Sequence, residues 1–538
     1  MGFEHLELKE LDHEVEGVEE TGGTWGSFVH DFIKRLGRYQ SANKQLLRNV
    51  EIPHFDINDD ATDRDLLLTH SVPHKFQLGT GSSIYTDILI PAITSARSEA
   101  ILVTCFWAPS QTLTAIHDAI AKLAAHRRAV NDDARLKGTP ILPRLRARIC
   151  FSSRSVLQKL VHTQSRNGYV YPSASWQKKL GLPDPALLDA GAIDLQVKSL
   201  FFLPFSVMHP KFVIIDRQRA FIPSCNVSWE PWLEGCVEIT GDAVNGLLSF
   251  YSRTWDVSRS ESGLGRLPNP DRDAPASRGF DAQEAGLVKI TSTADCNTVF
   301  DNLTAPTQTI LLPSSSHRNP RFRPFPWQKH PEPPSTPLNV AMLELLEGAR
   351  QSIYMQTPNL TCEAVIGSLL DAVIRGVDVT IVTGRDMMLL EQLVTAGTTT
   401  SWCIRSLLRR FRKLEVGIRG QRAADVEVGQ TTPRLGRLLV SYFRPRPRSQ
   451  SIGRERQPLM TEGQEDPVHS HLKLTIVDHQ FTVLGSGNMD RASWFTSQEL
   501  GVLFHNQALA TSIRTAVDGV LDSRLDVVFD SAAATGQE

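Results

Sequence analysis

The chain has 538 residues, of which 41% are hydrophobic and 22% are charged, and its formal net charge is −2. These values indicate a globular protein of two or three domains and exclude a globally basic nucleic-acid-binding protein. Its seven cysteines are scattered and form no C-x-x-C pair, which indicates a reducing compartment rather than a disulfide framework.

The sequence also predicts where the protein resides. The acidic start of the chain lacks an apolar core, so we expect no signal peptide. No stretch approaches the roughly eighteen consecutive apolar residues that a membrane span needs. We therefore expect an intracellular protein, either cytoplasmic or peripheral on a membrane.

In chain order, residues 1–76 predict a partly helical extension with an amphipathic helix over residues 25–47. The elements that follow are predicted twice in the same order. They are helix 85–97, strand 100–106, helix 113–127 and strand 147–151, then helix 338–350, strand 352–356, helix 363–375 and strand 377–382. Strands that alternate with helices favour an α/β sandwich, a mixed β-sheet flanked by helices, in each half.

The domain organisation follows from this repeat. We predict one α/β domain over residues 77–257 and a second over residues 285–530. Residues 258–284, rich in Ser, Gly, Pro and Asp, are the predicted linker. The second domain carries a basic insertion over about residues 405–468. We expect the two domains to face each other across a pseudo-twofold axis, with a single site at their interface.

One set of polar residues occurs once in each half with nearly the same spacing. His and Lys are two positions apart, Asp follows Lys by five and Asn follows His by seventeen; Glu follows Asn by twelve in one copy and eleven in the other. The copies are His209, Lys211, Asp216, Asn226 and Glu238, then His471, Lys473, Asp478, Asn488 and Glu499. Ser224 and Ser486 each precede the Asn by two positions.

These residue types suit the chemistry of a phosphodiester. The motifs lie in apolar, strand-like runs at residues 207–216 and 471–478, where residues two apart share a face, so each imidazole is predicted beside its ammonium. Lysines and asparagines stabilise charge on phosphate oxygens, while one histidine attacks phosphorus and the other protonates the leaving oxygen. No Asp/Glu/His cluster has metal-site spacing, so we expect no metal or other cofactor.

The duplicated H-x-K-x4-D pattern, with Gly485-Ser486-Gly487-Asn488 after the second copy, resembles the phospholipase D superfamily. In the first copy Pro223 and Cys225 replace the two glycines. The resemblance implies two α/β domains, His209 as nucleophile and His471 as acid and base. It further implies that Glu238 and Glu499 orient the histidines and that Asp216 and Asp478 hold structure. Because one chain carries both motifs, we expect an active monomer.

The composition of the basic insertion gives an indication of the substrate class. From Arg405 to Arg456 there are thirteen Arg and one Lys against four acidic residues, with Leu, Tyr and Phe among the cations. A solvated helix over residues 404–414 followed by a basic loop explains this composition as well as a patch for anionic lipid does. We expect a phosphodiester substrate on a phospholipid membrane surface, cleaved by hydrolysis or by transfer to an alcohol. Nucleic acid, cleaved by a nuclease of the same superfamily, is the alternative.

Overall fold

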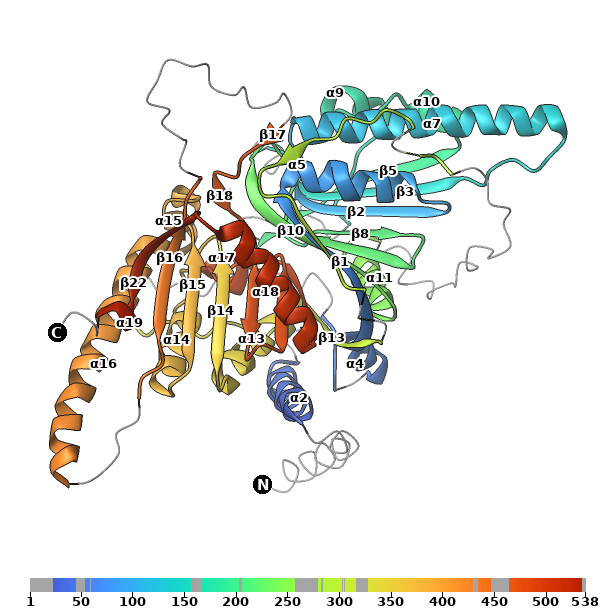
Figure 1. The fold of residues 1–538 in the computed structure, drawn as a ribbon. Helices are drawn as coiled ribbons and strands as arrows, with labels where there is room; N and C mark the ends of the chain where they lie inside the picture. The colour runs from blue at the N-terminus through green and yellow to red at the C-terminus, as the bar shows by residue number, and fades with distance from the viewer. Residues whose placement is uncertain are drawn as a thin grey trace, which may run out of the picture.

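A computed structural model shows the fold (Figure 1). It describes residues 23–44, 54–58, 60–155, 158, 167–202, 206–256, 279–281, 284–301, 303, 305–315, 328–428, 434–446 and 464–534. Most of the predicted linker and most of the basic insertion after residue 428 therefore lie outside the described residues. So do residues 1–22, 45–53 and 59 of the predicted N-terminal extension.

The first half is built on a mixed sheet. Three parallel strands are followed by four antiparallel ones, so that each strand pairs with the next in the order given. The strands are β5 (Ile193–Ser199), β3 (Leu145–Ser153), β2 (Glu99–Phe106), β8 (Phe212–Ile215), β9 (Arg219–Pro223), β10 (Trp232–Thr240) and β1 (Leu68–Thr80).

The second half repeats this arrangement strand for strand. The strands are β16 (Leu438–Phe443), β15 (Asp378–Thr383), β14 (Ser352–Thr357), β19 (Leu474–Val477), β20 (Phe481–Gly485), β21 (Glu499–His505) and β13 (Thr307–Ser314). The first three are parallel and the rest antiparallel, in the same order. The two halves therefore share one topology, which confirms the predicted pair of α/β domains.

Strand β1 joins the two sheets. Its first residues, Leu68–Ser71, pair with β13 of the second half, and Val72–Thr80 pair with β10 of the first half. The strand therefore begins before residue 77, where we placed the first domain boundary. Strand β12 (Cys296–Val299), which follows the predicted linker, also pairs with β1. The sheet is consequently continuous from one half to the other (Figure 1).

Helices cover both sheets at the places that the sequence predicts. Each predicted helix and strand of the repeat is present, with ends shifted by a few residues, and α7 runs on to Lys137, where Gly138 ends it in a left-handed conformation. The helices are α5 (Gly81–Ile84), η2 (Tyr85–Leu89), α6 (Ile90–Thr94), α7 (Gln111–Lys137), α11 (Ala243–Thr254), α13 (Pro337–Gly348), α14 (Glu363–Ile374), α16 (Thr400–Val428) and α18 (Gln507–Leu521).

The shorter elements complete the fold. They are α4 (Ala61–Leu67), β4 (Tyr169–Val170), η3 (Ser173–Ser175), α9 (Trp176–Leu180), α10 (Pro185–Ala190), β6 (Phe201–Phe202), β7 (Ser206–Val207), β11 (Thr291–Ser292), α15 (Leu389–Ala396), β17 (Gln464–Glu465), β18 (His469–Ser470), α17 (Arg491–Phe495), β22 (Leu525–Asp530) and α19 (Ser531–Ala534).

The predicted amphipathic helix near the N-terminus is α2 (Thr24–Ala42), and it packs on the second half. Its buried face includes Phe28, Phe32 and Leu36. Arg35 donates hydrogen bonds to Glu344 and Glu347 of α13, at 2.8 and 3.0 Å. The N-terminal helix thus adds to the hydrophobic core of the second half, although about 300 residues separate it from α13 in the sequence.

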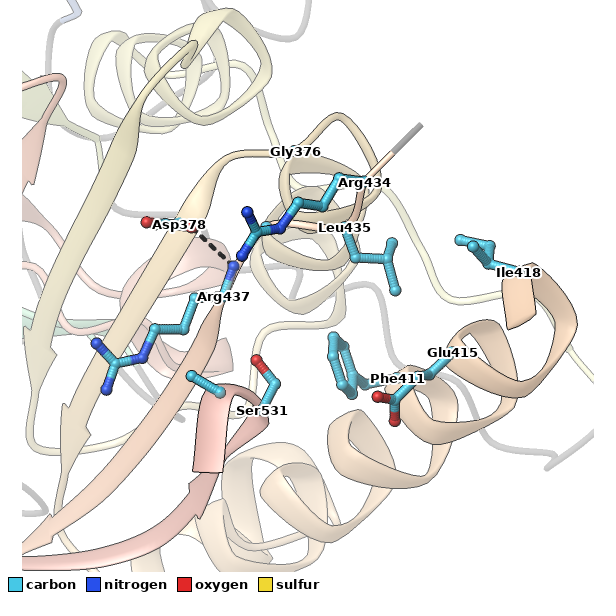
Figure 2. A pocket seen from close by; sticks show the side chains of 11 residues that line it. Gly376, Asp378, Phe411, Glu415, Ile418, Arg434, Leu435, Arg437 and Ser531 are labelled. Atoms are coloured by element: carbon cyan, nitrogen blue, oxygen red, sulfur yellow. Dashed lines mark hydrogen bonds between the residues drawn. The ribbon is translucent and has the colours of Figure 1, made fainter. Parts of the chain in front are cut away.

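A pocket of about 450 Å³ lies at one edge of the second sheet, between α16 and the starts of β15 and β16 (Figure 2). Phe411 and Leu435 line it, and the backbone N–H of Arg437 donates to Asp378 at 2.7 Å beside it. None of the duplicated motif residues lines this pocket. The candidate site therefore lies elsewhere, at the junction of the two halves.

Candidate active site

The main chain of each motif histidine is fixed by the opposite half. The N–H of His209 donates to the carbonyl of Gln498 at 3.0 Å, and the N–H of His471 donates to the carbonyl of Leu233 at 2.8 Å. Strand β10 also pairs in parallel with β18, directly before His471. The junction between the halves is therefore formed by the segments that carry the two histidines.

The prediction that each His-x-Lys step lies inside a strand is wrong. His209 to Lys211 form an irregular segment between β7 and β8, and His471 to Lys473 form one between β18 and β19. Pro210 cannot donate a ladder hydrogen bond, and the N–H of both histidines is used across the junction instead. The motif residues are thus held in extended connections at the strand starts.

Each histidine donates to a carboxylate of the other half. His209 Nδ1 lies 2.8 Å from Glu499 Oε2, and His471 Nδ1 lies 2.7 Å from Glu234 Oε1. Both carboxylates are buried. An Nδ1–H that is held in this way fixes the ring orientation and leaves Nε2 of a neutral imidazole with its lone pair. The pseudo-twofold relation therefore extends to the histidine partners.

A serine secures each of these carboxylates. The hydroxyl of Ser224 donates to Glu234, and the hydroxyl of Ser486 donates to Glu499 at 2.5 Å. Each serine also binds the backbone just after its carboxylate: Gly235 N donates to Ser224 Oγ at 2.9 Å, and Leu500 N donates to Ser486 Oγ at 3.0 Å. These matched bonds make Glu234 the counterpart of Glu499.

Glu238, which we predicted as the first-copy partner of a histidine, does not contact either one in the structure. It accepts hydrogen bonds from Arg219 of the neighbouring strand β9, at 2.7 and 3.0 Å. Matching the spacing after Asn selected it wrongly, because the second copy inserts helix α17 between Asn488 and Glu499. The backbone hydrogen bonds identify Glu234 instead, because Ser224 bonds to Gly235, the residue directly after Glu234, as Ser486 bonds to Leu500, the residue directly after Glu499.

The two lysines are buried at the same junction. Lys211 Nζ donates to the carbonyl of His209 at 2.9 Å, and Lys473 Nζ donates to the carbonyl of His471 at 2.7 Å. Lys473 Nζ also lies 2.8 Å from His471 Nε2. The lysines lie close enough for the charge of Lys211 to lower the pKa of Lys473. Two buried cations that converge in this way favour an anionic ligand such as a phosphate group.

Burial sets the protonation states of these groups. Desolvation lowers the pKa of His209 and lowers that of His471 to about 3, so both rings are neutral at pH 7. Desolvation, reinforced by the charge of Lys211, lowers the pKa of Lys473 to about 7. Lys473 thus exchanges its proton near neutral pH, in direct contact with the second histidine.

The histidines differ in access. The side chain of His209 is 16% exposed, whereas that of His471 is 3% exposed and lies against the Trp232 ring, 5.0 Å between centroids. Among the described residues no hydrogen bond occupies His209 Nε2, while Lys473 occupies His471 Nε2. The site is therefore chemically asymmetric despite its symmetric framework.

Both motif asparagines follow the strand that ends at the junction. Asn226 accepts a hydrogen bond from the N–H of Phe106 at 3.3 Å, which leaves its amide N–H group available as a donor. Asn488 donates to Asp490 at 3.1 Å. The turn before Asn488 requires glycine: Gly485 has φ +150°, and a Cβ there would lie 2.3 Å from the carbonyl oxygen of Leu500.

A buried polar chain behind Asn488 was not predicted. Asp490 accepts from Asn488 and, at 3.4 Å, from Asn359, whose oxygen accepts from Gln392 at 3.0 Å. Burial raises the pKa of Asp490. Ser228 occupies the corresponding position of the first copy, so the chain is confined to the second half. Its only sequence signal is an acid two residues after the motif Asn.

The motif aspartates lie away from the histidines. Asp216 accepts backbone hydrogen bonds from Arg97, Ser98 and Glu99, and Asp478 accepts them from the matching segment 350–352. Both have φ near +50°, in the left-handed region. These residues tie the turn after each motif strand to the start of β2 or β14.

Within the described part of the chain, no three or more His, Cys, Asp or Glu side chains are grouped as a metal site would require. The helices among these residues include none with the length and hydropathy that crossing a bilayer demands.

Comparisons with known proteins find similarity to part of the chain. Residues 342–520 match the sequence model of a family described as "Cardiolipin synthase, PLD-like domain". No curated protein matches. A structure titled phosphatidylserine synthase from Haemophilus influenzae is 14% identical with a TM-score of 0.47, covering 91% of each chain.

Two smaller solved structures resemble part of the chain. The phospholipase D family member Nuc from Salmonella typhimurium is 16% identical with a TM-score of 0.24, over 41% of this chain and 97% of its own. NucT from Helicobacter pylori is 12% identical with a TM-score of 0.22, over 34% of this chain and 87% of its own. The family match therefore identifies residues 342–520 as a PLD-like domain, and this range contains the second copy of the duplicated motif.

Proposed function

We propose that the protein cleaves the headgroup phosphodiester of a glycerophospholipid and transfers the phosphatidyl group to water or an alcohol through a covalent phosphohistidine. The observation that carries this proposal is the exchange of carboxylates across the junction, His209 with Glu499 and His471 with Glu234. It presents two oriented imidazoles and two buried lysines to one substrate. The match to the cardiolipin synthase family supports a lipid substrate.

His209 is the nucleophile in this mechanism. Its Nε2 is not occupied by a lysine, and its side chain is the more exposed of the two. Nε2 attacks phosphorus, a P–N bond forms and the bond from phosphorus to the headgroup oxygen breaks. Glu499 stabilises the positive charge that develops on the imidazole. Lys211, Lys473 and the amides of Asn226 and Asn488 stabilise the negative charge on the phosphoryl oxygens.

His471 handles the protons. Lys473 passes its proton to His471 Nε2, which delivers it to the departing headgroup oxygen and leaves Lys473 neutral. In the second step His471 Nε2 removes a proton from the incoming water or alcohol and returns it to Lys473. The new oxygen then bonds to phosphorus, the P–N bond breaks and His209 is restored. Glu234 holds the ring of His471 throughout both steps.

The test uses the pure protein with mixed phospholipid vesicles, EDTA and a short primary alcohol. Mass spectrometry should detect phosphatidyl-alcohol with the native chain and not with His209→Ala or His471→Ala. A substrate with a good leaving group should still label His209 in His471→Ala. Label on His471 in His209→Ala would reverse the two roles. Absence of phosphatidyl-alcohol and phosphatidic acid, with cleavage of single-stranded DNA or RNA, would replace the lipid substrate by nucleic acid.

A further inference from the structure

The short helix α15 has an unusual surface for its position in the fold. It follows β15, and four of its eight residues are exposed large hydrophobics: Leu389, Leu390, Leu393 and Val394. Leu390 is 77% exposed, and only Gln392 is buried. Such a concentration of exposed large hydrophobic side chains is costly in water and marks an interaction site.

The start of α16 continues this surface. Trp402 is 55% exposed, and the exposed face of the helix then passes through Arg405 and Arg409 at helical spacing. Leu393, Val394, Trp402 and Arg409 line one groove of about 670 Å³. We call Leu389, Leu390, Leu393, Val394, Trp402, Arg405 and Arg409 the α15–α16 face.

The charge of this face is predominantly positive. Among the described residues, Arg405 and Arg409 have no carboxylate partner, and Arg409 donates only to the backbone carbonyl of Arg405 at 3.4 Å. The groove carboxylate Glu363 is already paired with Arg410 at 2.5 Å. One acid, Glu391, lies on α15. Exposed leucines, a tryptophan and unpaired arginines together match the boundary between acyl chains and anionic headgroups.

The face is connected to the active site by hydrogen bonds. Gln392, the buried residue of α15, donates to Asn359, and Asn359 donates to Asp490, which holds Asn488. Helix α15 also packs on α17, three residues beyond Asn488. Figure 1 places α15 at the edge of the second sheet at which β15 ends. A bilayer on this face would lie next to the junction that carries the histidines.

We infer that the α15–α16 face docks on an anionic phospholipid bilayer, with the side chains of α15 and Trp402 inserted among the acyl chains and Arg405 and Arg409 at the headgroups. This surface deepens the proposed function, on which it rests, because it delivers the enzyme to a lipid substrate in its bilayer. Arg405 and Arg409 belong to the basic insertion that the sequence offered for this role, whereas the apolar part of the face, on α15 and at Trp402, precedes that insertion.

The test measures vesicle binding separately from catalysis. In the His209→Ala background, co-sedimentation with phosphatidylcholine–phosphatidylglycerol vesicles is compared for Leu390→Asp and for Leu136→Asp. Leu136 is a matched control: it is 87% exposed on α7, in the other half. Leu390→Asp should weaken binding by roughly tenfold or more, because it removes a leucine that would insert among the acyl chains and adds a charge in its place. Leu136→Asp should bind like the parent protein.

Two further measurements examine the contribution of the two arginines to binding and the depth to which Trp402 inserts in the bilayer. The double variant Arg405→Glu/Arg409→Glu should lose most of the preference for anionic over phosphatidylcholine vesicles and most of its salt sensitivity. Quenching of tryptophan fluorescence by lipids brominated on the acyl chain should decrease in Trp402→Phe. Equal binding by Leu390→Asp and Leu136→Asp, with unchanged quenching in Trp402→Phe, would overturn the inference.

Activity with His209 intact separates this inference from the proposed function. Leu390→Asp should keep turnover of monomeric short-chain phosphatidylcholine and lose turnover of vesicles. If the native chain turns over neither lipid while Leu390→Asp still fails to bind vesicles, the proposed function fails and the docking surface stands. If turnover of vesicles is equal for Leu390→Asp and the native chain, the docking surface fails and the proposed function stands.

Discussion

His471 and Glu234 lie 237 residues apart in the chain, yet Nδ1 of the histidine is 2.7 Å from the carboxylate. The pair spans the junction of the two halves, and His209 with Glu499 mirrors it. In both pairs the histidine comes from one half and the carboxylate that it contacts comes from the other half. The candidate active site therefore forms only when both halves are joined, as the continuous pairing through β1 and β10 joins them here.

The exchange predicts that Glu234 and Glu238 differ sharply in importance. Glu234→Gln should lower kcat by about a hundredfold or more, because the amide no longer stabilises a charged imidazole on His471. Glu238→Gln is the matched control on the same strand and should retain most of the activity, since Glu238 contacts Arg219. The measurement is phosphatidyl transfer at saturating substrate. Equal losses in the two variants would contradict the assignment of Glu234.

The lowered pKa of Lys473 predicts an alkaline limb in the pH profile. Lys473 is charged below its pKa of about 7 and loses its proton as the pH rises through that value. Because the charged form binds phosphate, kcat/KM of the free enzyme should fall above about pH 7. Lys473→Arg keeps its charge throughout this range, so the limb should disappear, although kcat/KM at neutral pH should be lower. A limb at the same pH in Lys473→Arg would assign it to another group.

Burial of the histidines predicts how kcat/KM depends on pH below neutrality. Desolvation lowers the pKa of His209, so its Nε2 stays unprotonated below the usual histidine range. Loss of kcat/KM on acidification should therefore begin below pH 6.5, the reference pKa of histidine, rather than at it. Glu499→Gln removes the carboxylate that favours the charged imidazole and should move this limb further toward acid. A limb that moves toward neutral pH in Glu499→Gln would contradict this account.

Asp490 is predicted to position Asn488. Asp490→Asn should lower kcat/KM by about tenfold and weaken inhibition by inorganic phosphate, because the amide of Asn488 loses its charged acceptor. Ser228→Ala, at the corresponding position of the first copy, is the control and should change neither quantity. If Asp490 acted only on stability, Asp490→Asn would lower the melting temperature of the protein but leave inhibition by phosphate unchanged at low temperature.

The motif aspartates are predicted to act on stability. Asp216→Ala removes the acceptor of three backbone N–H groups and places alanine at φ +50°, so the free energy of unfolding should fall by about 2–4 kcal/mol. Asp216→Asn keeps an acceptor and tolerates this backbone conformation, so its loss should be smaller. Chemical denaturation measures both. Loss of kcat at low temperature without loss of stability would instead place Asp216 in the chemistry.

Much of this molecule follows from the sequence itself. The periodic apolar segments predicted the order of helices and strands in both halves, because a sheet flanked by helices needs those periods wherever it forms. The doubled spacing selected the histidine, lysine and asparagine side chains that the structure gathers at one junction. The spacing of two within each motif was sufficient for this even though the motif segments are not strands, because the extended backbone keeps the side chains close.

Only the tertiary structure decided which carboxylate serves which histidine. The motif copies are not equal in length, because α17 adds residues between Asn488 and Glu499, so spacing along the chain pointed to Glu238. The partners are set instead by backbone pairing across the junction and by Ser224 and Ser486, contacts between residues distant in sequence. The exposed face of α15 likewise follows from which side of the helix the fold leaves uncovered. A local sequence fixes its own periodicity, whereas pairing and exposure depend on the elements that pack against it.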